Sequence, residues 1–139
     1  MARKCAGRLG PLSLALLLAA CAPAGDADAG RSIFRLGIRA DGSPVRATIA
    51  GADVEGALVA CARCHGARAE GHTEGGVHAP ALGPRSASFR AGLGALRRAL
   101  EAGRGRGRPL DPAMPRYRLR ARDAADLRAY LARVDTDPE

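Results

Sequence analysis

Cys61-Ala62-Arg63-Cys64-His65 carries the strongest chemical signal in this sequence. Two thiols at this spacing can bond to the two vinyl groups of one haem, and a histidine directly after the second thiol is held against the haem iron. The motif therefore predicts one covalently attached haem c per chain, bound through Cys61 and Cys64, with His65 as an iron ligand. The other segments can be interpreted as a pocket around that group.

Three other interpretations of the two cysteines are open. A thioredoxin-type dithiol needs a βαβ scaffold, which nothing after Cys64 resembles. A zinc site completed by His65, His72 or His78 would normally include a second closely spaced Cys or His pair, which the sequence lacks. A disulfide within the motif would close almost no loop and would stabilise little. Haem attachment is the interpretation that the spacing favours.

The motif and its flanks, together with Pro112-Ala113-Met114-Pro115-Arg116-Tyr117 downstream, resemble a class I c-type cytochrome. The resemblance covers most of residues 54–134. It implies that His65 is the proximal iron ligand, that Met114 on a late loop is the distal ligand, and that the carbonyl of Pro80 orients the histidine ring. A hydrogen bond of this kind fixes the tautomer of a metal-bound histidine.

Met114 is the only methionine after the first residue of the chain, and prolines stand close to it on both sides. A lone methionine is more often core filler than a metal ligand. The haem motif upstream and the M-P-x-Y match favour ligation, and the prolines would stiffen the loop. His72 and His78 compete as ligands of a bis-histidine haem, but no motif supports them and we expect both at the surface.

Residues 1–20 have the pattern of a signal peptide, with three basic residues followed by an apolar run. The run is too short to span a bilayer permanently. It ends in Leu18-Ala19-Ala20-Cys21, which resembles the lipobox of bacterial lipoproteins and implies lipid modification of Cys21. An ordinary signal peptide cut near Ala20 is the alternative. Both predict export, and the lipobox predicts a periplasmic domain anchored to a membrane by lipid.

The chain divides into a signal peptide (1–20), a lipid-anchored tether (21–30) and a cytochrome c domain (31–139). The expected fold class is all-α, the class I cytochrome c fold, with three or four helices around one covalent haem. The chain has two Phe, two Tyr and no Trp, so the flat apolar surface of the haem would supply much of the core. We therefore expect the apo form to be poorly folded.

Gly30 and Phe34 resemble the start of the family's N-terminal helix, in which a glycine and an aromatic residue pack against the last helix. Typical members reach the haem motif within a few residues, whereas 26 residues separate Phe34 from Cys61 here. We interpret residues 35–53 as an insertion. It contains the turn signal Asp41-Gly42-Ser43-Pro44 followed by alternating apolar and polar residues, which predicts a short strand or hairpin.

Apolar periodicity and capping residues predict three further helices. Asp53 would cap a helix that delivers Cys61 to the haem, and Ser88 would cap a helix that ends at Gly103. Arg120, where similar proteins carry a capping Ser or Thr, precedes the last helix. That helix has the clearest period, with apolar residues at i, i+3, i+4 and i+7, namely Leu127, Tyr130, Leu131 and Val134.

Two segments rich in glycine are expected to be loops. The four glycines within residues 66–76 predict a loop that passes close to the haem, where side chains would be in the way. Arg104-Gly105-Arg106-Gly107-Arg108 has three interpretations: a patch that faces a partner or a membrane, a source of one guanidinium for a haem propionate, or a solvated loop.

The basic charge favours some partners and excludes others. The full chain has a net charge of +8, and loss of residues 1–20 leaves 19 basic against 14 acidic residues, or +5. Export, few aromatic residues and the lack of a nucleic-acid motif argue against binding to nucleic acid. An acidic surface on a redox protein partner, or anionic lipid head groups, fits the charge better.

These features and the resemblance imply a one-electron carrier on the periplasmic side of a membrane, rather than an enzyme with its own substrate. Two alternatives stay open. One is an electron-accepting haem subunit of a periplasmic dehydrogenase complex, and the other is a gas-binding or sensor haem whose distal ligand leaves. Resemblance of fold alone does not choose between them.

Overall fold

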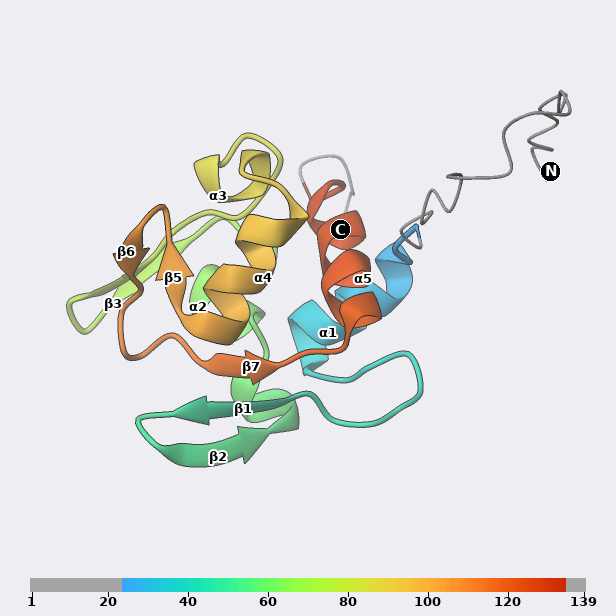
Figure 1. The fold of residues 1–139 in the computed structure, drawn as a ribbon, viewed down its shortest axis with the longest axis horizontal. Coiled ribbons are helices and arrows are strands. Elements are labelled where there is room, and N and C mark those ends of the chain that lie inside the picture. The colour runs from blue at the N-terminus through green and yellow to red at the C-terminus, as the bar shows by residue number, and fades with distance from the viewer. Residues whose placement is uncertain (1–23, 135–139) are drawn as a thin grey trace, which may run out of the picture.

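The structure is a computed structural model and describes residues 24–134 (Figure 1). The expected signal peptide and the lipobox with Cys21 lie outside the described residues, so cleavage and lipidation stay predictions. Within the described range, no helix is long and apolar enough to cross a membrane.

Helices and strands both contribute to the described part of the chain. The helices are α1 (Ala27–Leu36), η1 (Gly56–Val59, a 3-10 helix), α2 (Ala62–His65), α3 (Ala87–Arg90), α4 (Leu93–Ala102) and α5 (Ala121–Leu131). The strands are β1 (Arg46–Ile49), β2 (Ala52–Glu55), β3 (His72–Glu74), β4 (Val77–Ala79), β5 (Arg104–Gly105), β6 (Arg108–Pro109) and β7 (Arg116–Arg118). The prediction of an all-α fold is therefore wrong.

The strands form three small antiparallel sheets. One has the order β2-β1-β7, in which β1 and β2 form a hairpin, and the other two are the hairpins β3-β4 and β5-β6. Each of the three hairpins reverses direction through two residues with positive φ: Ala50-Gly51, Gly75-Gly76 and Arg106-Gly107. Such turns match the twist of paired strands, and glycine adopts positive φ without steric cost. A strand forms where the alternating residues predicted one, as β1, and its hairpin partner β2 extends to Glu55, beyond the insertion interpreted as residues 35–53. Residues 66–76, expected to be a loop beside the haem, instead end in the turn of the β3-β4 hairpin.

The helix expected to start at Asp53 is absent, because residues 52–55 pair with β1 as strand β2. Cross-strand hydrogen bonds along the whole of β1 satisfy more backbone groups than one short isolated helix would. The chain then turns through η1, and Cys61 directly precedes α2. Cys61 is thus presented by two short helical turns rather than by one long helix.

The helix expected to start at Ser88 is divided in two. Ser86 caps α3, with its Oγ accepting from the backbone N–H of Phe89 at 3.1 Å. Gly92, at φ 88°, separates α3 from α4. The predicted end at Gly103 is confirmed, since this residue caps α4 in the left-handed conformation.

Helices α1 and α5 lie side by side and form the main helical core (Figure 1). A Cβ at Gly30 would lie 2.0 Å from the backbone oxygen of Asp126, so only glycine allows this approach. The rings of Phe34 and Tyr130 pack with centroids 5.3 Å apart. The packing expected of Gly30 and Phe34 is therefore confirmed, and all four predicted apolar residues of the last segment are buried.

The first helix begins earlier than expected. Asp26 caps α1 by accepting from the backbone N–H groups of Asp28 and Ala29. The backbone N–H of Asp26 in turn donates to Asp126 Oδ1 at 2.7 Å. Residues 27–30 therefore belong to the folded domain and not to a flexible tether.

A buried ion pair ties the segment before the haem motif to the last helix. Arg39 Nε donates to Asp123 Oδ2 at 2.9 Å, and the two side chains are only 8% and 7% exposed. Arg39 also donates to the backbone oxygens of Pro44 and Arg118. Asp123 accepts the backbone N–H of Arg120 at 3.0 Å. The insertion is thus an integral part of the core rather than an appendage.

Candidate functional site

His65 has one ring nitrogen bonded and the other buried without a partner. It ends α2 and is 5% exposed. Its Nδ1 lies 2.8 Å from the carbonyl oxygen of Pro80. A carbonyl can only accept, so Nδ1 carries the hydrogen and Nε2 keeps its lone pair. Nε2 is buried and has no hydrogen-bond partner in the described part of the chain. Such orphaned groups are rare, and this one has the form of a metal-binding imidazole.

The surroundings also keep the ring of His65 uncharged. Burial lowers the pKa of His65, because the charged imidazolium is poorly solvated there, and the bond to Pro80 opposes this shift. Neutral imidazole is the form that binds a metal ion. The protonation state and the tautomer therefore both suit an iron ligand.

The two cysteines of the motif differ in their surroundings. Cys61 is buried and Cys64 is exposed, and neither is in a disulfide. Burial raises the pKa of the Cys61 thiol to about 11. In a redox-active dithiol, the pKa of the reactive thiol is lowered rather than raised. The thioredoxin interpretation is therefore disfavoured. Among residues 24–134, no three His, Cys, Asp or Glu side chains gather as a metal site, which disfavours zinc.

Tyr117 is a site residue to which the sequence analysis assigned no role. Its hydroxyl donates to the backbone oxygen of Val59 at 2.8 Å and lies 3.9 Å from Cys61 Sγ. Burial raises the pKa of Tyr117, so the hydroxyl stays protonated. Because Val59 lies two residues before Cys61, this bond fixes the chain where it enters the haem motif. The M-P-x-Y match was the only sequence signal that included Tyr117.

Met114 lies in the loop between β6 and β7. Its side chain is half-buried and packs against the core cluster that contains Cys61, Leu100 and Tyr117. Its backbone N–H donates to the oxygen of Asp111 at 3.0 Å. Met114 thus packs against the hydrophobic core of the described residues, to which Cys61, Phe34 and Tyr130 all belong.

Several apolar side chains around this cluster are only partly buried. They come from the three-stranded sheet as well as from the helices and loops, and they are Ile49, Val54, Ala62, Leu82, Phe89, Leu96, Met114 and Leu119. Apolar side chains that are only partly covered are typical of a site for an apolar cofactor. The two free thiols and the unpartnered Nε2 of His65 are the donor set that a haem c needs, so the residues present fit a haem held by Cys61, Cys64 and His65.

The two competing histidines lie together on another element. His72 in β3 and His78 in β4 are exposed, as expected. The Nδ1 of His78 lies 2.9 Å from the hydroxyl oxygen of Thr73, on the neighbouring strand. Neither ring is buried as the ring of His65 is.

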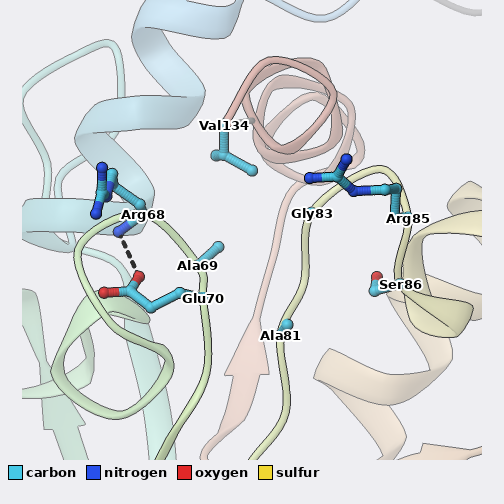
Figure 2. Close-up of a pocket in the computed structure, with 8 residues that line it drawn as sticks. All are labelled: Arg68, Ala69, Glu70, Ala81, Gly83, Arg85, Ser86 and Val134. Atoms are coloured by element: carbon cyan, nitrogen blue, oxygen red, sulfur yellow. Dashed lines mark hydrogen bonds between the residues drawn. The ribbon is translucent and has the colours of Figure 1, made fainter. Parts of the chain in front are cut away.

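A hollow of about 390 Å³ lies beside the segment that follows His65. Arg68 and Glu70 line one side of it, with Arg85 across from them and Val134 between (Figure 2). The carboxylate of Glu70 accepts the backbone N–H of Arg68 at 2.8 Å. Neither cysteine of the motif nor Met114 lines this hollow, but Ala81, the neighbour of Pro80, does.

The family model described as Cytochrome c matches residues 50–135, which is more than half of the chain. No curated protein and no solved structure gives a significant match. The matched range includes the cysteine motif, Pro80 and Met114. Helix α1 and strand β1 lie before it.

Proposed function

Because this chain belongs to the cytochrome c family and therefore serves haem-based electron transfer, we propose that it is a one-electron carrier with a single haem c. In this proposal Cys61 and Cys64 hold the haem covalently, and His65 and Met114 are its two axial ligands. When bound, the haem supplies an iron that accepts and releases one electron as it changes between Fe(III) and Fe(II).

The observation that carries this proposal is the state of the His65 ring. Nδ1 is bonded to the carbonyl oxygen of Pro80, and Nε2 is buried with no partner among the described residues. The resemblance to the family assigns the same orienting role to Pro80. A ring held in this way loses little freedom when Nε2 binds iron, and its tautomer needs no change.

Met114 supports the carrier interpretation through the chemistry of its sulfur. A thioether is a weak donor that favours Fe(II), and histidine–methionine ligation raises the reduction potential. With both axial positions filled, neither oxygen nor a substrate can reach the metal. Met114 is half-buried against the hydrophobic core to which Cys61 also belongs, and this supports the assignment.

We also propose export to the periplasm and a lipid anchor at Cys21, on the sequence evidence of residues 18–21. Intact-mass measurement of the mature protein tests this directly. A diacylglyceryl adduct on a chain that begins at Cys21 is expected. A chain of unmodified mass that partitions into the aqueous phase would contradict the anchor.

The β5-β6 hairpin supports the proposal of an acidic redox partner. Arg104, Arg106 and Arg108 are all exposed, and none forms an ion pair within residues 24–134. Other arginines have carboxylate partners in the structure, as Arg46, Arg97, Arg118 and Arg120 do. The hairpin lies on the opposite side of the molecule from α1, the first helix of the described residues (Figure 1). These cations therefore favour an acidic protein surface over the anchoring membrane.

Two measurements on the purified coloured protein test the function. Acid–acetone extraction should leave the colour with the polypeptide, because thioether bonds survive it. A potentiometric titration followed by absorbance should fit the Nernst equation for one electron, with a low-spin iron in both states. Haem lost to the solvent, or zinc in place of iron by elemental analysis, would contradict the proposal.

A further inference from the structure

Arg116 directs its guanidinium at the loop that carries Met114. It is the first residue of β7, two residues after the methionine, and it is half-buried. Nη1 donates to the backbone oxygen of Met114 at 2.5 Å. Nη2 makes two longer contacts of 3.4 Å to the backbone oxygens of Leu110 and Asp111. All three acceptors belong to the methionine loop, residues 110–114.

The end of α4 bounds the guanidinium on its other side. A Cβ placed on Gly103 would lie 1.9 Å from Nε of Arg116. Gly103 also has a φ of 63°, so both its backbone conformation and the lack of space for a Cβ favour glycine at this position. The backbone N–H of Leu110 donates to the oxygen of Gly103 at 2.8 Å, which starts the methionine loop at this point. Arg116 therefore lies between the end of α4 and the loop.

The methionine loop has few bonds of its own. Pro112 lacks an N–H, and the bonds within the loop run from Ala113 and Met114 to Asp111. Its remaining carbonyls need donors from elsewhere, and a guanidinium supplies several in a fixed planar fork. The backbone of Arg116 is itself fixed, because it pairs with Thr48 of β1. The loop is thus bonded through Arg116 to the three-stranded sheet.

We propose that Arg116 is a positioning residue that holds the methionine loop, so that the thioether of Met114 stays on the iron. This inference rests on the proposed function, in which Met114 is the distal ligand. A loop released from Arg116 would sample positions in which the sulfur is away from the metal. The fraction of molecules with an open iron would then rise.

The test uses the ferric holoprotein and the charge-transfer band that an iron–thioether bond gives in red light. Arg116→Gln should lose this band at a lower pH and a lower temperature than the unmutated protein. In the reduced state, Arg116→Gln should bind carbon monoxide, which the unmutated protein should not, because several bonds to a charged donor are lost. In Arg116→Lys, the stability of the band should lie between that of the unmutated protein and that of Arg116→Gln, since one cationic donor remains.

Two further variants separate positioning from general stability. Arg118→Gln removes an exposed arginine from the same strand, whose partner is Asp53 and not the methionine loop, and it should leave the band unchanged. Gly103→Ala keeps Arg116 but displaces its guanidinium, so it should weaken the band as Arg116→Gln does. Because alanine at φ 63° also strains the end of α4, Gly103→Ala is compared in the unmutated and the Arg116→Lys proteins, and a role of Arg116 predicts a smaller further loss of the band in the second.

The outcomes distinguish this inference from the proposed function. If the unmutated protein has no iron–thioether band, the assignment of Met114 fails and the role of Arg116 fails with it. If the unmutated protein has the band and neither Arg116→Gln nor Gly103→Ala weakens it, Met114 stays the ligand and the role of Arg116 is wrong. Equal weakening by Arg118→Gln would show general destabilisation and would also overturn it.

Discussion

The imidazole Nδ1 of His65 and the carbonyl oxygen of Pro80 lie 2.8 Å apart, although 15 positions separate the two residues in the chain. The chain between them includes the β3-β4 hairpin, which brings its two ends back together. The backbone N–H of Leu82 donates to the oxygen of Ala69 at 2.9 Å and closes the same segment. The orientation of the proposed iron ligand is therefore set by the backbone rather than by a mobile side chain.

The first prediction concerns His65 itself. In His65→Ala, the thiols of Cys61 and Cys64 remain, but the iron loses its proximal ligand. Any haem that is retained should be high-spin in both oxidation states, as absorption and electron paramagnetic resonance spectra would show. His78→Ala is the matched control, because His78 is exposed on β4. A low-spin spectrum in His65→Ala, lost instead in His78→Ala, would assign the ligand to the hairpin.

The second prediction concerns the other proposed axial ligand. Met114→Ala should leave a coordination position open, so that the reduced protein becomes high-spin and binds carbon monoxide. Met114→His should stay low-spin with a markedly lower reduction potential, because imidazole is a stronger donor than a thioether to Fe(III). His72→Ala should change neither property. A spectrum unaffected by Met114→Ala would rule out this ligand.

The third prediction concerns the bond that fixes the entry to the haem motif. Tyr117→Phe leaves the backbone oxygen of Val59 without its buried donor. We expect the free energy of unfolding to fall by about 1–3 kcal/mol, the cost of an unsatisfied buried group. Denaturant unfolding of the holoprotein measures it. Tyr130→Phe retains the ring that packs on Phe34 and should cost less. An equal loss in the two variants would mean that the cost of Tyr117→Phe is not specific to the bond with Val59.

The fourth prediction concerns the buried pair of Arg39 and Asp123. Asp123→Ala leaves the guanidinium of Arg39 buried without its partner, and removal of one member of such a pair costs about 3–5 kcal/mol. Arg46→Gln breaks the exposed pair with Glu55 and should cost less than about 1 kcal/mol. Thermal unfolding of both variants makes the comparison. Similar losses in the two would mean that the insertion is only loosely attached to the core.

The fifth prediction concerns the arginines of the β5-β6 hairpin. Changing Arg104, Arg106 and Arg108 to Gln should slow electron transfer with the redox protein that co-purifies from solubilised membranes. The difference from the unmutated protein should disappear at about 1 M salt, where charges are screened within about 3 Å. The reduction potential should not change. A loss of binding to anionic vesicles, with unchanged transfer rates, would assign the hairpin to lipid instead.

Local chemistry could be predicted from the sequence, and long-range pairing could not. The C-x-x-C-H spacing, the Pro80 bond implied by the resemblance, and the apolar period of Leu127 to Val134 are local or motif-based signals. The strands are not of this kind. Asp53 has the local pattern of a helix cap, but its segment pairs with β1 in the folded chain. Strand β7 also pairs with β1, although most of the domain's sequence lies between them.

The contacts that hold the site together depend on the same long-range arrangement. Arg39 and Asp123 are 84 positions apart, and Tyr117 reaches Val59 across 58 positions. Hydrophobic periodicity does not predict such pairs, because nothing in the local sequence around either partner indicates the other. In the sequence, nothing distinguishes Arg116 from the other arginines. Only the fold shows that Gly103 and the methionine loop surround its guanidinium.

Addition of carbon monoxide to the reduced, unmutated holoprotein decides between a carrier and a reactive haem. With His65 and Met114 both on the iron, no coordination position is open, so the absorption spectrum should be the same before and after the gas is added. A rapid change to the spectrum of a carbon monoxide complex would contradict the carrier function. It would show that the distal ligand is absent or leaves easily, as a gas-binding or sensor haem requires.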